Sequence, residues 1–250
     1  MKRFYSDVGL AQTDLGWTIG LDGRPVKTQG GRPQAVPSEA LAHMLAQEWA
    51  EQGDTIDPAA FRYRDMTDYA IDVVAREPAP LVDKLLGYAE TDTLCYRADP
   101  EDALFRRQQE LWEPLVAGME AREGVKLHRI SGILHRPQTE DTLARLRARL
   151  SALDPFTLTA LEQTTALAAS LCIGLEALEP DADGEALWDA ANLEEDWQAD
   201  LWGRDEEAAA RREKRKGDFL TAMTFAQVTR GAASAHQQEC SVGYKKEQQQ

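Results

Sequence analysis

Cysteine is scarce in this sequence, and its three positions exclude several kinds of protein. Cys95, Cys172 and Cys240 are odd in number, lie far apart and form no CxxC pair. A disulfide framework and a structural zinc site are therefore not expected. Cys95 and Cys172 each lie in a short apolar run, so both are predicted to be small buried hydrophobic residues. A reducing compartment fits this use of cysteine.

A long hydrophobic run is also missing. The most apolar stretch, Ala166–Leu175, is only about half as long as the ~20 residues that a membrane-spanning helix needs. The first residues, Met1–Asp7, have neither the apolar core of a signal peptide nor the arginine- and serine-rich character of a transit peptide. We therefore expect neither export nor membrane insertion.

Basic residues are outnumbered by acidic ones. Lys and Arg total 28 against 43 Asp and Glu, which gives a formal net charge of -15 at pH 7. A surface this acidic repels phosphate backbones and anionic lipids, so we expect no nucleic acid and no membrane surface as partner. The charge favours solubility, and it also favours encounter with a basic partner protein.

Recognisable catalytic motifs are absent from the chain. It contains no glycine-rich nucleotide loop, no HExxH motif and no GxSxG motif. The histidines show no ligand spacing; they are His43, His128, His135 and His236. Two enzyme hypotheses stay open: a nucleophilic Cys95 paired with a histidine, and an Mg²⁺ or Mn²⁺ site that uses Glu194 and Asp200. A solvated acidic face explains the same carboxylates, so we expect no enzyme, no cofactor and no metal.

The N-terminal part has the alternation of β-strands. Trp17, Ile19 and Leu21 alternate with Thr18 and Gly20, and Asp22-Gly23 is a two-residue turn signal. Pro25 in the following segment favours a sheet edge, because proline cannot donate a ladder hydrogen bond. Ala35-Val36 predicts a further short strand. A small β-rich domain is therefore expected over residues 1–37, or up to about residue 60.

Helical spacing begins at Ser38, which is a predicted N-cap. A second helix is expected from about Asp65, and the pairs Asp99-Pro100 and Asp154-Pro155 predict two further helix starts. The latter helix is expected to reach about Leu178, and another helix to span 184–202 before one capped by Asp205. The whole is an α+β fold, with a helical domain over 38–230 and a disordered tail over 231–250.

The segment 184–202 is the strongest candidate for a contact surface. In the helix expected here, one apolar stripe should face the core; its members are Ala186, Ala190, Leu193, Trp197 and Leu201. Trp188, Glu195 and Trp202 then lie on nearly the opposite side, with Glu194 at the border. Indoles beside a carboxylate indicate a partner surface, because Trp is enriched at binding hot spots. The alternative is that neighbouring elements cover this face.

A basic run, Arg211–Lys216, follows the acidic segment. It is compatible with a nucleic-acid patch, but its acidic surroundings favour ion pairing with neighbouring carboxylates or plain solvation.

Several segments together resemble the F1-ATPase assembly chaperones that escort the α subunit. The likeness spans about Arg3 to Phe225. It is carried by Leu21-Asp22-Gly23-Arg24-Pro25-Val26-Lys27-Thr28, by Ala46-Gln47-Glu48-Trp49, by Thr91-Asp92-Thr93-Leu94-Cys95-Tyr96-Arg97, and by Leu193-Glu194-Glu195 with Trp197-Gln198 and Trp202-Gly203. Their order and spacing are specific as a set. Phe61–Thr67 departs from the family pattern, because it lacks the Met-Pro pair that members often carry.

This resemblance implies a small β-rich domain before a larger helical one, and ATP-independent binding of unassembled F1 α subunit, whose uncovered surface aggregates. The family acts in mitochondria or in related bacteria, and because no transit peptide is recognised, we expect a bacterial cytoplasmic member or a processed form. The residues expected to contact the partner are Glu194, Glu195, Gln198, Trp188 and Trp202, with Trp49 as a further candidate. We expect a monomer when free. An adaptor with another partner stays open beside the enzyme hypotheses.

Overall fold

The protein folds into two compact units. The computed structural model describes residues 1–132, 136–203 and 205–246, with side chains described to Arg230. Unit 1 comprises Met1–Arg76, Pro155–Thr159 and the residues from Thr224 onward, and unit 2 comprises Glu77–Asp154 and Ala160–Met223. The domain limits expected near residues 37 or 60 and at 230 stay predictions, as does the disordered tail.

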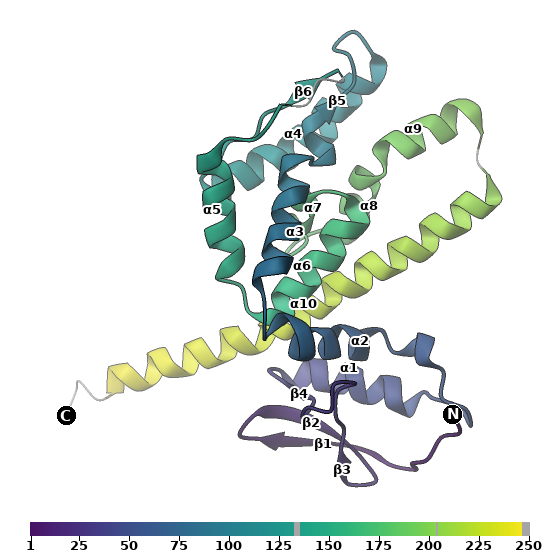
Figure 1. Ribbon diagram of the computed structural model, residues 1–250, viewed down its shortest axis with the longest axis vertical. Helices are drawn as coiled ribbons and strands as arrows, with labels where there is room; N and C mark the ends of the chain where they lie inside the picture. Colours follow the sequence, from purple (N-terminus) through teal and green to yellow (C-terminus); the bar gives the residue numbers. More distant parts are fainter. Residues whose placement is uncertain (133–135, 204, 247–250) are drawn as a thin grey trace. The chain divides into compact units, whose positions relative to one another are not determined.

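Unit 1 contains a small antiparallel sheet (Figure 1). Its strands are β1 (Val8–Thr13), β2 (Gly16–Leu21), β3 (Arg24–Pro25) and β4 (Ala35–Val36), and β2 pairs with each of the other three. The expected hairpin turn is confirmed: Asp22 and Gly23 join β2 to β3 with φ of 47° and 76°, the left-handed values that a tight two-residue hairpin requires. The Asp22 carboxylate accepts the backbone N–H groups of Ser6 and Asp7 at 3.0 and 2.8 Å.

Two helices cover this sheet in unit 1. Helix α1 (Glu39–Ala50) lies on the strands, and α2 (Arg62–Tyr69) packs on α1 and continues into the π-helical turn η2 (Ala70–Val74). Ser38 caps α1 as expected, since its hydroxyl accepts the Leu41 N–H at 3.0 Å. Between the helices lies the short η1 (Pro58–Ala60). The core of the unit includes Ile19, Val36, Leu41, Leu45, Trp49 and Phe61.

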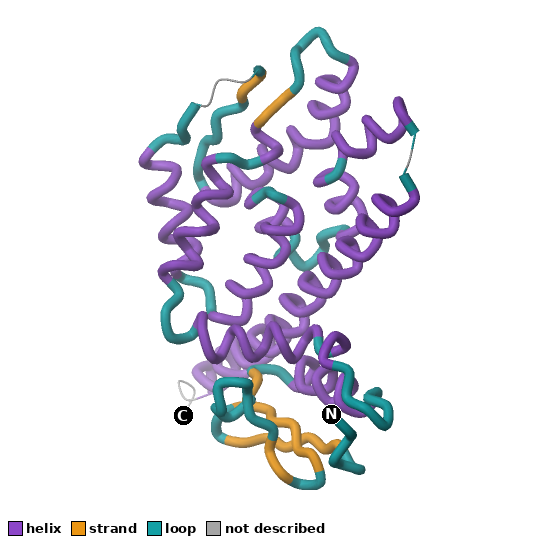
Figure 2. The backbone as a smooth tube through the Cα atoms, turned by 45° about the vertical axis from the view of Figure 1, so that its right-hand side comes forward, coloured by secondary structure: helices purple, strands orange, loops and turns teal. Residues whose placement is uncertain are grey.

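Unit 2 is almost entirely helical (Figure 2). Its elements in chain order are α3 (Ala79–Glu90), η3 (Thr93–Cys95), β5 (Tyr96–Arg97), α4 (Ala103–Glu123), β6 (Ile130–Ser131), α5 (Glu140–Ser151), α6 (Pro155–Ala168), α7 (Leu171–Glu176), α8 (Gly184–Ala191), α9 (Leu193–Trp202) and α10 (Glu206–Lys246). The ends of α6 and α10 belong to unit 1, where Phe156 and Phe225 stack at 6.2 Å. The short strands β5 and β6 pair in parallel. The expected α+β fold is confirmed.

Two of the expected helix limits are wrong. The helix that begins at Pro155 ends at Ala168 rather than near Leu178, because Ala169 adopts a left-handed φ of 50° and Ser170 caps a new helix, α7. Asp99-Pro100 forms a turn instead of a helix start, and α4 begins at Ala103 after Asp102. In both places a local capping signal competes with a neighbouring one.

The packing of α6 against α7 depends on a glycine in α7. A Cβ atom on Gly174 would overlap with the Thr165 hydroxyl and approach Leu161 Cδ1 to 3.1 Å. Gly174→Ala should therefore lower the free energy of unfolding by about 1–3 kcal/mol. Gly118→Ala in α4 is the matched control, because nothing lies within 4 Å of its Cβ position, and it should raise stability by about 0.5–1 kcal/mol. Urea unfolding of both variants measures the difference; equal effects would contradict the packing argument.

No helix in the described part of the chain is long and apolar enough to cross a membrane.

Candidate functional site

Trp188 lies in the core of unit 2, so its expected outward position is wrong. Its side chain has 0% exposure and packs against Phe219, with ring centroids 5.6 Å apart, while the Arg215 guanidinium lies 5.7 Å from its ring. Ala186, expected on the buried stripe, is exposed instead. The Trp188 side chain therefore stabilises the packing of α8 on α10 and, being buried, cannot contact a partner.

A break at Asn192 explains this error. The residue has φ −105° and ψ 14°, and both its backbone N–H and its side-chain Nδ2 donate to the Trp188 carbonyl oxygen, at 3.1 and 2.7 Å. These bonds end α8 and let α9 begin in a new orientation. The side-chain directions predicted for one continuous helix consequently do not hold all the way from Ala186 to Leu201.

Helix α9 presents an exposed apolar end beside carboxylates. Leu193 at its start is buried, whereas Leu201 is 63% exposed and Trp202 is 86% exposed. Leu201, expected to face the core, is therefore another correction. Monomeric proteins seldom expose such large apolar side chains side by side unless they form a contact surface.

Three of the expected contact residues lie together in one groove. The groove has a volume of about 700 Å³ and runs between α9 and the first turns of α10. Glu195, Gln198 and Trp202 come from α9, and all three are exposed. We call the surface formed by Glu195, Gln198, Leu201 and Trp202 the α9 surface.

Basic residues of α10 hold α8 and α9 in place. Arg212 Nη2 donates to Asp196 Oδ2 at 2.6 Å and to Asp189 Oδ1 at 3.2 Å, so one guanidinium joins both helices to α10. Lys216 pairs with Glu185, and Arg211 pairs with Glu207 at 2.6 Å. The expected pairing of the basic run with nearby acids is thus confirmed. Arg212 therefore fixes α9 against α10, and Lys216 fixes α8.

Glu194 differs from Glu195 in having a hydrogen-bond partner on another helix. Its Oε1 accepts the Gln108 Nε2 at 2.8 Å, and Gln108 lies buried in α4. Burial raises the pKa of Glu194 above its ordinary value, although the Gln108 amide opposes the shift. Gln108 in turn accepts the Ala98 N–H at 2.8 Å. Glu194 therefore links α9 to α4 while the residue as a whole stays exposed, and the contact role expected for it stays a prediction.

Trp49 belongs to the core of unit 1. Only 7% of it is exposed, and its ring packs edge-on against Tyr5 at 5.5 Å and tilted against Phe61 at 4.6 Å. The preceding residue, Glu48, accepts the backbone N–H groups of Tyr63 and Arg64 at 2.6 and 2.9 Å, at the start of α2. The Glu48-Trp49 pair is therefore a structural junction, and the contact role expected for Trp49 stays a prediction.

The groups needed by the enzyme hypotheses are not brought together in the described residues. Cys95 and Cys172 are fully buried free thiols, so neither can reach a substrate. The described His, Cys, Asp and Glu residues include no group of three or more that could hold a metal ion. His135 lies outside the described residues, and the described side chains do not include His236.

An exposed indole beside carboxylates, on a helix held by ion pairs, is typical of protein-contact surfaces. A family model described as ATP12 chaperone protein matches residues 2–120. The mitochondrial protein atp12 of Schizosaccharomyces pombe is 29% identical over 223 residues, which cover 83% of this chain and 75% of that protein.

Two solved structures match almost the whole chain. Atp12 of Paracoccus denitrificans has a TM-score of 0.87 and 36% identity, over 92% of this chain and 98% of that one. The Agrobacterium tumefaciens protein Atu1473 has a TM-score of 0.85 and 34% identity, over 91% and 85%. The chain belongs to the ATP12 chaperone family, and the resemblance to the F1-ATPase assembly chaperones is confirmed.

Proposed function

We propose that this protein is an ATP-independent chaperone that binds the unassembled F1 α subunit through the α9 surface. The observation that carries the proposal is the exposure of Trp202 and Leu201 at the end of α9. Arg212 and Gln108 hold this helix in place through hydrogen bonds to Asp196 and Glu194. A client-binding surface needs apolar anchors with a polar rim. Glu195 and Gln198 supply that rim in the same groove.

This geometry fits a chaperone that holds its client without catalysing a reaction. A partner that covers an aggregation-prone surface needs contacts that can be released, and an exposed surface of this size gives modest affinity assisted by charge. The net charge of -15 favours a client face with basic residues around its apolar centre. The same function requires no nucleotide, and we infer that soluble α subunit accumulates without ATP hydrolysis by this chain. The free chain is proposed to be a monomer in the cytoplasm.

Trp202→Ala tests the apolar anchor. Co-expression of the α subunit with the unaltered chain should yield soluble α subunit, and the Trp202→Ala variant should lower that yield at least fivefold, because hot-spot indoles contribute about 2 kcal/mol or more. Leu15→Ala is the matched control, since Leu15 is 71% exposed in the β1–β2 turn. It should leave the yield unchanged. Equal yields from both variants would remove Trp202 from the surface.

A further inference from the structure

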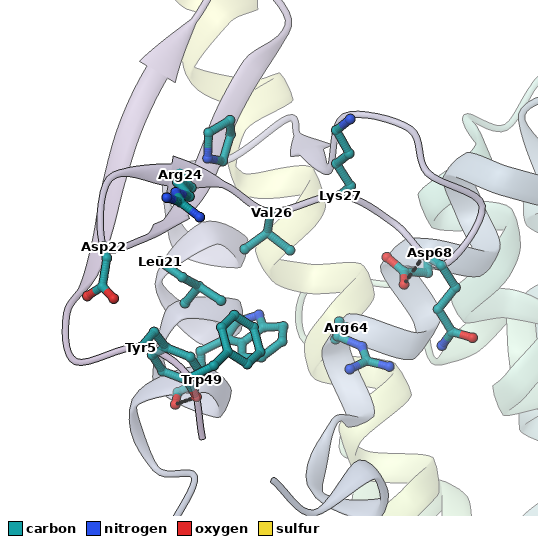
Figure 3. A pocket seen from close by; sticks show the side chains of 12 residues that line it. Tyr5, Leu21, Asp22, Arg24, Val26, Lys27, Trp49, Arg64 and Asp68 are labelled. Atoms are coloured by element: carbon teal, nitrogen blue, oxygen red, sulfur yellow. Dashed lines mark hydrogen bonds between the residues drawn. The ribbon is translucent and has the colours of Figure 1, made fainter. Parts of the chain in front are cut away.

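A second cavity lies wholly within unit 1 and plays no part in the α9 surface (Figure 3). Its volume is about 560 Å³. The β2–β3 hairpin and the segment after it form one side, with Arg24, Val26 and Lys27, and the helices form the other, with Trp49 and Arg64. Its apolar and aromatic walls are Phe4, Tyr5, Leu21, Pro25, Val26 and Trp49.

Two buried nitrogen donors at this cavity have no acceptor among the described residues. They are Nε1 of Trp49 and Nε of Arg64. Trp49 is 93% buried, because its exposed fraction is only 7%, and the Arg64 guanidinium lies 5.9 Å from its ring. Buried polar groups in native proteins are nearly always hydrogen-bonded. Neither nitrogen is exposed to solvent, so a ligand oxygen would reach them only after the surrounding side chains move.

The acidic and the basic side chains at the cavity differ in how far they already have partners within the protein. Its two carboxylates are occupied internally: Asp22 accepts the N–H groups of Ser6 and Asp7, and Asp68 accepts the Gln34 amide at 2.6 Å and the Gln29 N–H at 3.0 Å. Arg24 and Lys27, on the same side as Asp22, are exposed and form no salt bridge within the described part of the chain. The charge available to a ligand is therefore positive, on a protein whose net charge is -15.

We propose that this cavity binds an extended peptide segment of a partner protein, in which a glutamate or aspartate stands next to large apolar side chains. The carboxylate pairs with Arg24 and Lys27, which are exposed at the cavity. The apolar neighbours pack on Tyr5, Val26 and Phe4, and Phe4 is already 61% exposed. The site is independent of the α9 surface, so it stands or falls separately from the function proposed above.

The walls favour a peptide over a small anion. A lone carboxylate or phosphate would leave most of the ~560 Å³ and the apolar walls unfilled. Apolar contact with aromatic side chains, together with a few well-placed polar groups, is typical of sites for larger ligands. A peptide with both chemical features uses the basic side chains and the walls at once.

The test is peptide binding to the full-length chain, measured by fluorescence anisotropy. The probe is a labelled acetyl-Ser-Leu-Glu-Phe-Ser-Gly-amide, and its partner probe has Gln in place of Glu. The Glu peptide should bind at least tenfold more tightly, with an affinity that falls as salt rises. The variant R24E/K27E should weaken Glu-peptide binding at least tenfold.

Arg76→Glu is the matched charge control, because Arg76 is exposed in unit 1 and does not line the cavity. It should bind the peptide as the unaltered chain does, and circular dichroism should show that all variants are folded. The proposal is overturned by any of four outcomes: no saturable binding, equal affinity for the Gln peptide, unchanged binding by R24E/K27E, or displacement of the peptide by equimolar acetate. Self-association of the chain that R24E/K27E abolishes would make a second copy the occupant, and would also overturn it.

Discussion

Glu195→Lys should abolish the solubilisation of co-expressed F1 α subunit without unfolding the chaperone. Glu195 lines the groove of the α9 surface, is exposed, and forms no hydrogen bond or ion pair within the described part of the chain. Reversing its charge replaces attraction to a basic client group by repulsion. Loss of one member of a desolvated charge pair costs 2–5 kcal/mol of binding free energy, so affinity should fall about 30-fold or more. Soluble α subunit should fall to the level seen without the chaperone.

The control for this variant must lower the stability of its own helix by the same amount. Glu195 lies in the first turn of α9, where the helix dipole favours a carboxylate by about 0.3–1 kcal/mol. Glu140→Lys makes the same change at an exposed position in the first turn of α5. It should lower the free energy of unfolding by the same ~0.3–1 kcal/mol as Glu195→Lys, and it should leave α-subunit solubility unchanged. If both variants solubilise the α subunit as well as the unaltered chain, Glu195 is not in the binding site.

Local signals in the sequence predicted the features that local physics decides. The Asp22-Gly23 turn requires left-handed backbone at both residues, and the Ser38 cap depends on a hydroxyl three residues from its donor. Asp205 likewise caps α10, since its Oδ1 accepts the Ala208 N–H at 2.7 Å. None of these depends on where distant parts of the chain lie, so each could be predicted correctly.

The orientation of side chains along 184–202 could not be predicted in the same way. Projection on a helical wheel assumes an unbroken helix, and the break at Asn192 carries neither Gly nor Pro. Asn is a known competitor for backbone hydrogen bonds, and that was the one available signal. A continuous helix would place Trp188 outside and Leu201 inside, and the structure places both the other way.

Two neighbouring glutamates show a second limit of the sequence. Glu194 and Glu195 are equivalent in composition, charge and local motif. Only the position of Gln108, 86 residues away along the chain, makes Glu194 a link between helices and leaves Glu195 for a partner. Such an assignment depends on tertiary contacts, which spacing within one helix cannot supply.

Asp92→Ala should be the most destabilising single change outside the hydrophobic core. The Asp92 side chain is completely buried and accepts three hydrogen bonds: from Leu94 N at 3.0 Å, from Ser170 Oγ at 2.7 Å and from Cys172 N at 2.9 Å. It thus joins η3 to the start of α7. Its removal leaves two buried backbone N–H groups without an acceptor, at about 1–3 kcal/mol each. The free energy of unfolding should fall by about 3 kcal/mol or more, as measured by urea denaturation.

The pH dependence of this loss separates the buried carboxyl group from an ordinary cap. Burial raises the pKa of Asp92 above 3.8 in the folded protein. A group whose pKa is raised on folding stabilises the folded protein fully at pH values below its pKa in the unfolded chain. This stabilisation is lost as the pH rises through the pKa of the group in the folded protein. The cost of Asp92→Ala should therefore be larger at about pH 4.5 than at about pH 7.5. Asp183→Ala removes an exposed N-cap of α8 and should cost only about 1 kcal/mol. Equal losses for the two variants would mean that burial does not decide the strength of the Asp92 junction.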